Sequence, residues 1–200
     1  MSTIVTASGR EINLARPVHT DITLYDISHS LGQINRYAGH CRRPYSVAEH
    51  SILVADIAQR RYGLDVSGQL AALLHDGHEA YVGDVSSPVK QLLDDTWLHL
   101  EARIERTVRI AFGLLVACDM YRDIIKASDI VALATERMQL MPKSPTPWPI
   151  LQGVEPADWV DLMDTGRQRM TWSDWASAFR DRADELDYAR NQALFAREPA

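Results

Sequence analysis

Apolar residues recur along most of the chain at the spacing of an α-helix. Between residues 26 and 37, for example, Ile27, Leu31 and Ile34 follow one another by four and three positions, which places them on one helical face. The same spacing predicts helices that begin after residue 46 and at residue 173, and helices over residues 66–82, 88–93, 96–112, 121–141 and 156–163. The pattern therefore predicts a mostly α-helical protein.

Capping residues indicate where several of these helices begin and end. Ser46 is a predicted N-cap, with Glu49 at the capping-box position. Gly83 and Gly113 are placed to end two of the helices, because glycine readily adopts the left-handed conformation at a helix C-terminus. The proline-rich run at 142–149 ends the longest periodic segment, since proline cannot continue a helix.

The final helix is predicted to be amphipathic. Ser173 is in position to cap it, and Trp175, Phe179 and Leu186 fall on its inward face. Such a helix would also provide a surface for a homo-oligomer.

The first residues carry the only strand signals. Residues 3–6 and 10–14 are predicted to form two strands, joined by a turn at 8–9 and stopped by Pro17. No internal repeat or linker divides the pattern. We therefore predict a single domain over residues 1–200, a helical bundle with a small N-terminal β-hairpin.

Composition narrows the class of protein. Of the 200 residues, 46% are hydrophobic, and no apolar block of about twenty residues could span a bilayer. The N-terminus lacks the basic and apolar regions of a secretory signal, and Cys41 and Cys118 form no CxxC pair, so we expect packing cysteines in a cytoplasmic protein. A net charge of -6 argues against a broad nucleic-acid-binding surface and leaves only a local basic pocket, near Arg36, Arg42 and Arg43.

Several ionisable residues occupy positions that should face the core. His50 and Asp129 each lie on the apolar face of a predicted helix. On the helix over 66–82, His75 and Glu79 are four positions apart and share one side, while Asp76 points to its flank. A buried carboxylate without a partner costs several kcal/mol, and a divalent cation removes that cost. Two imidazoles and two carboxylates, without thiolates, suit Zn, Mn, Fe or Co.

Each of these residues also has a simpler interpretation. A single histidine on an apolar face is more often a hydrogen-bonded core residue than a metal ligand. Asp129 alone is also explained as an ion-pair partner of Arg137 or Lys126. The HisAsp pair at 75–76, on a helix accompanied by two others with buried ligand-type residues, favours the metal site.

The pattern of a His, a HisAsp pair and a distant Asp resembles that of the HD-domain metal-dependent phosphohydrolases. Within that superfamily, the chain is most similar to the bacterial and phage 5'-deoxynucleotidases and to the phage dATP triphosphohydrolases. The matching stretches lie at 34–40, 45–51, 73–90 and 126–136. The resemblance implies an HD-domain helical bundle with its motif-bearing core at about 9–141, followed by a proline-rich loop and C-terminal helices over 142–200.

The resemblance also implies roles for residues around the metal. The four ligands are His50, His75, Asp76 and Asp129, and Glu79 is the catalytic glutamate that orients or deprotonates water. Outside these, Asp84 matches a second acidic residue that holds the water or a sugar hydroxyl, although capping the following turn explains it equally well. We expect Zn, Co or Mn at the site, with Mg as a possible second ion.

Substrate-binding residues are expected in four places. By resemblance, Arg36 binds phosphate, which its guanidinium fork suits, and Tyr37 packs near the sugar or base. Lys90 offers charge toward a polyphosphate, or is a solvated surface residue. His78 lies near a second metal or a phosphate, or at the surface. His40 binds phosphate, or fixes the loop before the next helix.

These observations favour a dNTP triphosphohydrolase, acting on dATP and releasing triphosphate. The nearest alternative is a 5'-deoxynucleotidase acting on dNMPs, because both reactions use the same metal ligands. A hydrolase of cyclic nucleotides or guanosine tetraphosphate is a broader alternative, and a non-catalytic nucleotide-binding module is an alternative of another class.

Overall fold

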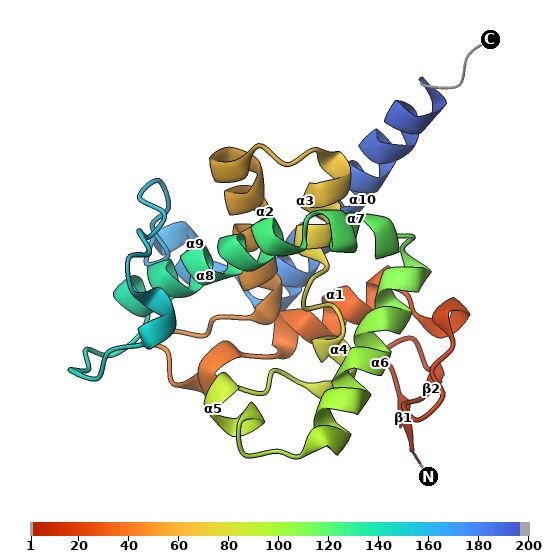
Figure 1. Cartoon of the computed structure of the whole chain (residues 1–200), viewed down its shortest axis with the longest axis horizontal. Helices are drawn as coiled ribbons and strands as arrows, with labels where there is room; N and C mark the ends of the chain where they lie inside the picture. Colours follow the sequence, from red (N-terminus) through yellow and green to blue (C-terminus); the bar gives the residue numbers. More distant parts are fainter. Residues whose placement is uncertain (1, 197–200) are drawn as a thin grey trace.

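A bundle of helices with one small β-hairpin makes up the protein (Figure 1). The computed structural model describes residues 2–196. Its elements are β1 (Thr3–Val5), β2 (Glu11–Asn13), η1 (His19–Asp21), α1 (Leu24–Gln33), η2 (Arg36–Gly39), α2 (Val47–Tyr62), α3 (Val66–Leu73), α4 (Glu79–Val82), α5 (Ser87–Lys90), α6 (Asp95–Ala111), α7 (Leu115–Met120), α8 (Arg122–Gln139), η3 (Pro149–Leu151), α9 (Thr165–Arg169) and α10 (Trp172–Phe195). The predicted fold class, a mostly helical bundle with an N-terminal hairpin, is confirmed.

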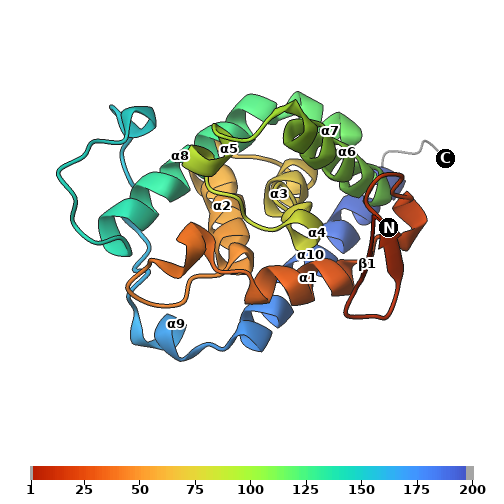
Figure 2. The ribbon, with the colours of Figure 1, turned by 90° about the horizontal axis from the view of Figure 1, so that it is seen from below.

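Helix α2 lies at the centre of the bundle. It packs against α8 on one side and against α1 and α10 on the other, with α3 beside it (Figure 2). Apolar side chains fill the core between these helices. Leu31, Val54 and Phe179 are examples, and none of them has any exposed surface. None of the helices within residues 2–196 has the combination of length and hydropathy that spanning a membrane requires.

The apolar face of α10 is an internal surface. Trp175, Phe179 and Leu186 are buried, as predicted, against α1, α2 and α3. That face therefore does not provide the surface for self-association that the sequence suggests. The cap of α10 also differs from the prediction: Thr171, not Ser173, precedes the helix, and its hydroxyl accepts a hydrogen bond from the backbone N–H of Asp174 at 3.3 Å.

The hairpin is fastened to α1 through one carboxylate. Ile4 pairs with Ile12, whose side chain is 1% exposed, and Gly9 turns the chain at φ 81°. Asp26 of α1 is buried and accepts hydrogen bonds from the backbone N–H and the hydroxyl of Ser8, both at 2.8 Å. The turn of the hairpin is thus held against the helical bundle.

Two predicted helices are wrong in their extent, and both errors lie beside the site described below. The helix predicted over 26–37 ends at Gln33, because the backbone of Ile34 and Arg36 bonds instead with the segment around Tyr45. Tyr37 and Ala38 consequently take left-handed conformations, with φ of 56° and 49°. Non-glycine residues adopt this region only at a cost in conformational energy.

The helix predicted over 66–82 is broken in the middle. It ends as α3 at Leu73, passes through turns over 74–78, and resumes as α4, which Gly83 ends at φ 84° as predicted. Gly77 permits the break, since a Cβ there would come within 3.1 Å of the Leu74 carbonyl oxygen and 3.2 Å of the Val108 side chain. The backbone at Gly77 thus lies against the Val108 side chain of α6, where a larger residue would be crowded.

The C-terminal third departs further from the sequence pattern. Residues 156–163 form no helix, and the short helix α9 lies later, with Asp164 capping it. Helix α7 was not predicted at all. The expected capping box of α2 is half formed: the Ser46 hydroxyl accepts from the Glu49 N–H at 3.1 Å, but the Glu49 carboxylate is bound by Arg43 and Arg167. That ion cluster ties α9 to the start of α2.

Candidate metal centre

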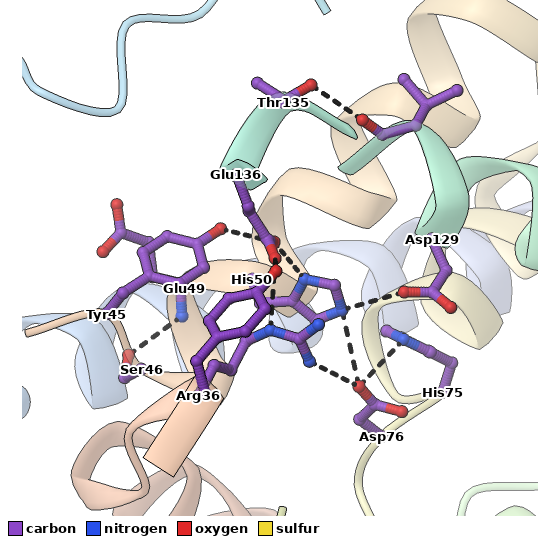
Figure 3. Close-up of polar contacts among 12 residues, drawn as sticks. Arg36, Tyr45, Ser46, Glu49, His50, His75, Asp76, Asp129, Thr135 and Glu136 are labelled. Atoms are coloured by element: carbon purple, nitrogen blue, oxygen red, sulfur yellow. Dashed lines mark hydrogen bonds and ion pairs between the residues drawn. The ribbon is translucent and has the colours of Figure 1, made fainter. Parts of the chain in front are cut away.

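Three of the four predicted metal ligands form one tight group, and the fourth, Asp129, contacts it through His50. His50 comes from α2, Asp129 from α8, and His75 and Asp76 from the turn after α3 (Figure 3). His50 Nε2 lies 3.4 Å from Asp129 Oδ1 and 3.5 Å from Asp76 Oδ2, and His75 Nε2 lies 3.1 Å from Asp76 Oδ2. Ligand atoms of His50, His75 and Asp76 all lie within 4.8 Å of one another. Three distant segments therefore form one cluster.

Both imidazoles turn the same nitrogen toward this point. Nδ1–H of His75 donates to the carbonyl oxygen of Ala72 at 2.8 Å, and Nδ1–H of His50 donates to Glu136 Oε1 at 2.6 Å. The Nε2 atoms of His50 and His75 are buried and make no hydrogen bond with any described residue. Histidine ligands of metals are commonly oriented in this way, through a hydrogen bond from the other ring nitrogen.

The cluster keeps its carboxylates charged. Burial raises the pKa of Asp76. The nearby His75 and His50 lower it by more than burial raises it, so the pKa lies well below its usual value. For Asp129, burial likewise opposes ionisation, but the nearby imidazoles of His50 and His75 outweigh it, so the pKa is lowered. Two ionised carboxylates beside two imidazoles form a donor set of nitrogen and oxygen atoms, which fits a divalent cation.

Asp129 also forms one of the two ion pairs that the sequence offered as an alternative, through the oxygen that does not face His50. Lys126 donates to Asp129 Oδ2 at 2.8 Å, whereas Arg137 turns away and donates to the carbonyl oxygen of Thr146. Because the Lys126 side chain is 60% exposed, this ion pair is screened by water and weak. Oδ1 of Asp129 remains directed at His50.

Glu79 lies in a position that opposes its ionisation. It begins α4, is 4% exposed, and its Oε2 atom has no hydrogen-bond partner among the described residues. Burial, followed by the charges of Asp76 and Asp84, raises the pKa of Glu79 to about 10. Burial also raises the pKa of Asp84, against the opposing charge of Arg36. In the metal-free protein, Glu79 therefore carries a proton at neutral pH.

Arg36 and Tyr37 also reach this cluster, from η2. Arg36 Nη1 lies 3.6 Å from Asp76 Oδ2, and its Nε lies 3.4 Å from Glu136 Oε2. The Tyr37 hydroxyl donates to Glu136, and its ring lies 6.2 Å from that of Trp148, between centroids. The guanidinium end of Arg36 thus faces the candidate ligands, while Tyr37 is held by a buried acid.

His78 and Lys90 share a partner that the sequence did not indicate. His78 is 6% exposed, so its surface placement is wrong, and its Nε2 lies 3.4 Å from Glu101 Oε1. Lys90 donates to the same oxygen, and its side chain is 29% exposed, so it is not a freely solvated surface residue. His40, by contrast, is exposed at the end of η2.

Glu136 is the residue of this cluster that sequence reasoning missed. It follows Asp129 by seven positions on α8, which places both on one face two turns apart. Its side chain is completely buried and bonded to His50, Tyr37 and Tyr45. The seven-residue spacing was the available signal.

Comparison with known proteins places the chain in a family. It is 32% identical over 163 residues to Uncharacterized protein YfdR of Escherichia coli (strain K12), a match covering 82% of this chain and 86% of that protein. The chain belongs to the YfdR family. Uncharacterized protein RCAP_rcc00048 of Rhodobacter capsulatus is 37% identical over 137 residues, which is 66% of this chain and 70% of that protein. No family model matches the chain.

The similarity to YfdR includes the region of the cluster. A match of 163 residues in a chain of 200 contains residues 50–136 wherever it begins. The segments that carry the candidate ligands, Glu79 and Glu136 thus lie within the part of the chain that aligns with YfdR.

Proposed function

We propose that this YfdR-family protein is a metal-dependent phosphohydrolase of the HD-domain type, which cleaves the 5' phosphoester of deoxynucleotides. One observation carries the proposal: the unbonded, buried Nε2 atoms of His50 and His75 face the carboxylates of Asp76 and Asp129. The sequence resemblance, together with Glu79 and Arg36 beside this cluster, supports the same function.

The residues divide the chemistry as follows. When bound by His50, His75, Asp76 and Asp129, a Zn, Co or Mn ion lowers the pKa of water and polarises phosphate oxygen. Glu79 exchanges a proton at Oε2 with the attacking water or the leaving oxygen, which suits a carboxyl whose pKa is raised. Arg36 offers guanidinium hydrogens to the phosphate that approaches from its side of the cluster.

The length of the phosphate chain distinguishes the two leading substrates. A dNTP, dATP above all, is favoured by the resemblance of residues 34–40 to the triphosphohydrolases. Charge favours the alternative of a dNMP, because Lys90 is paired with Glu101 and Arg43 with Glu49, which leaves less positive charge for additional phosphates. His78 lies beside the same Glu101 carboxylate, so it also adds little positive charge for additional phosphates.

A product assay tests the proposal and separates the substrates. Purified protein, stripped of metal and then supplied with Co, Mn, Zn or Mg, is incubated with dNTPs, dNMPs, NTPs, cyclic nucleotides and guanosine tetraphosphate. Release of triphosphate identifies the dNTP reaction, and release of orthophosphate from dNMPs identifies the 5'-deoxynucleotidase. Hydrolysis of only the last two compounds, or no hydrolysis with any metal, refutes the proposal.

A non-catalytic nucleotide-binding module would bind deoxynucleotides without hydrolysing them, and replacing Glu79 would leave that binding unchanged. Equilibrium dialysis, combined with the same product assay, recognises this outcome. We further propose that the enzyme acts on the free deoxynucleotide pool of the cytoplasm; the predicted homo-oligomer would have to use a surface other than the buried face of α10. Light scattering on the eluting protein measures the mass and tests the oligomer.

A further inference from the structure

Glu136 lies where three functional candidates meet. Its carboxylate has no exposed surface. Oε1 accepts hydrogen bonds from Nδ1–H of His50 at 2.6 Å and from the Tyr45 hydroxyl at 3.0 Å. Oε2 accepts from the Tyr37 hydroxyl and lies 3.4 Å from Nε of Arg36. In Figure 3 this carboxylate lies on one side of the His50 ring, and Asp76, His75 and Asp129 lie on the other.

A buried carboxylate at this position contributes little to the stability of the fold. Removing a charge from water costs several kcal/mol, about as much as its new partners return, so replacement by an apolar side chain is often neutral for stability. The fully buried residues one turn before and after it on the chain, Ala132 and Leu140, are apolar. Packing alone therefore gives no reason for an acid here.

The bond to His50 determines which nitrogen is free. Because Nδ1 carries the proton that Glu136 accepts, the lone pair of the neutral ring lies on Nε2, which faces Asp76 and Asp129. A carboxylate partner also makes the ring a more basic ligand. Glu136 thus fixes both the tautomer and the rotation of His50.

One hydrogen bond and one ion-pair contact link Glu136 to a strained turn in η2. Tyr37 and Ala38 are both in the left-handed region, which costs about 1–3 kcal/mol per residue. The bond from the Tyr37 hydroxyl and the nearby Arg36 Nε tie this turn to α8. Arg36 Nε makes an ion-pair contact with Glu136 rather than a hydrogen bond, and Nη1 of the same guanidinium lies 3.6 Å from Asp76 Oδ2.

We propose that Glu136 is a positioning residue that orients His50 toward the metal and Arg36 toward the phosphate through one shared carboxylate. This inference rests on the proposed function for its metal and its substrate. It predicts that loss of Glu136 weakens metal binding and substrate binding together, although the residue touches neither.

Replacing Glu136 by Gln tests the proposal. An amide keeps the size but has one accepting oxygen, so it cannot serve the donors on both sides of Glu136. We expect the Kd for Co²⁺, measured by titration of the stripped protein, to rise about 10–100-fold, which is the usual effect of losing such a partner. The KM for the deoxynucleotide should rise as well, and Glu136→Asp, which restores the charge, should recover part of both losses.

Glu49→Gln is the matched control. Glu49 is also a completely buried glutamate, and it directly precedes His50, but its carboxylate is bound by Arg43 and Arg167. Its replacement should lower the Tm and leave the Kd for Co²⁺ unchanged. A Kd for Glu136→Gln that equals the wild-type value, or equals that of the control, overturns the proposal.

A second measurement serves if Glu136→Gln does not fold. In the wild-type protein loaded with Zn²⁺, the Nδ1 proton of His50 should give a nitrogen-bound imidazole signal in NMR that exchanges slowly with water. Exchange as fast as that of a solvated imidazole contradicts the bond to Glu136. A wild-type protein that binds no metal refutes the proposed function instead, so the two failures are distinguishable.

Discussion

Replacing Glu79 by Gln should stabilise the metal-free protein while abolishing its activity. The side chain is 4% exposed, and burial together with Asp76 and Asp84 raises the pKa of Glu79 from 4.5 to about 10. The folded chain holds a proton that the unfolded chain releases above pH 4.5. Stability that depends on this proton is fully present below pH 4.5 and is lost as the pH rises toward 10.

The magnitude follows from the interval between the two pKa values. At pH 7 the unfolded glutamate lies 2.5 units above its pKa of 4.5, and each unit corresponds to about 1.4 kcal/mol, so the acid costs about 3 kcal/mol of stability. A glutamine has the same size and no proton to release. The free energy of unfolding of Glu79→Gln should therefore exceed that of the wild type by about 3 kcal/mol at pH 7 and by little near pH 4.5.

Urea unfolding of the two chelator-stripped proteins between pH 5 and pH 7 measures this difference. The gap between variant and wild type should widen by about 2.5 kcal/mol across that range. Glu155→Gln, at an exposed position, provides the control and should show no such change. A gap for Glu79→Gln that stays constant with pH refutes the reasoning, and wild-type turnover by the variant removes Glu79 from the proton-transfer role.

Three further predictions concern other parts of the molecule. Asp129→Asn should weaken Co²⁺ binding in the titration described above and remove the rise in Tm that added metal gives the wild type; an unchanged metal-induced rise contradicts the ligand assignment. Asp26→Asn should cost about 1–3 kcal/mol in urea unfolding at pH 7, because its hydrogen bonds to Ser8 hold the hairpin. Burial opposes the lowered pKa of Asp26, but Thr23 and Ser8 outweigh it, so the wild type should lose this advantage as the pH falls below 3.8; a loss that is independent of pH would be inconsistent with an ionised partner. Phe179→Ala should cost about 3–5 kcal/mol, since it opens a cavity between α10 and the bundle, and a loss below 1 kcal/mol would show that α10 contributes little to the core.

The elements that the sequence predicted well are those decided by local periodicity. Ile27 and Leu31 are buried on α1, and Phe179 is buried on α10, because an apolar stripe must face another element wherever the helix packs. The Ser46 cap was likewise readable, since the bond spans three residues. The candidate ligands were identifiable because charged groups on an apolar stripe conflict with their position.

The extent of the helices around the site required the tertiary structure. Residues 34–37 have helical spacing but bond to the segment at 45–47, and that pairing replaces the end of the helix. Within the turns at 74–78, Gly77 lies close to Val108, more than thirty positions away, which leaves no room for a larger side chain. Neither competitor is visible within a window the length of a helix.

By itself, the sequence determined the helical class of this protein and the donor set of its candidate site, because spacing and residue type are local properties. Only the tertiary structure decided that α2, α8 and the turn after α3 bring His50, Asp76 and Asp129 together. It also decided the partners, Glu101 for His78 and Lys90, and Glu136 for His50. A hydrogen bond depends on distance in space, and these partners are separated by between eleven and eighty-six positions in the chain.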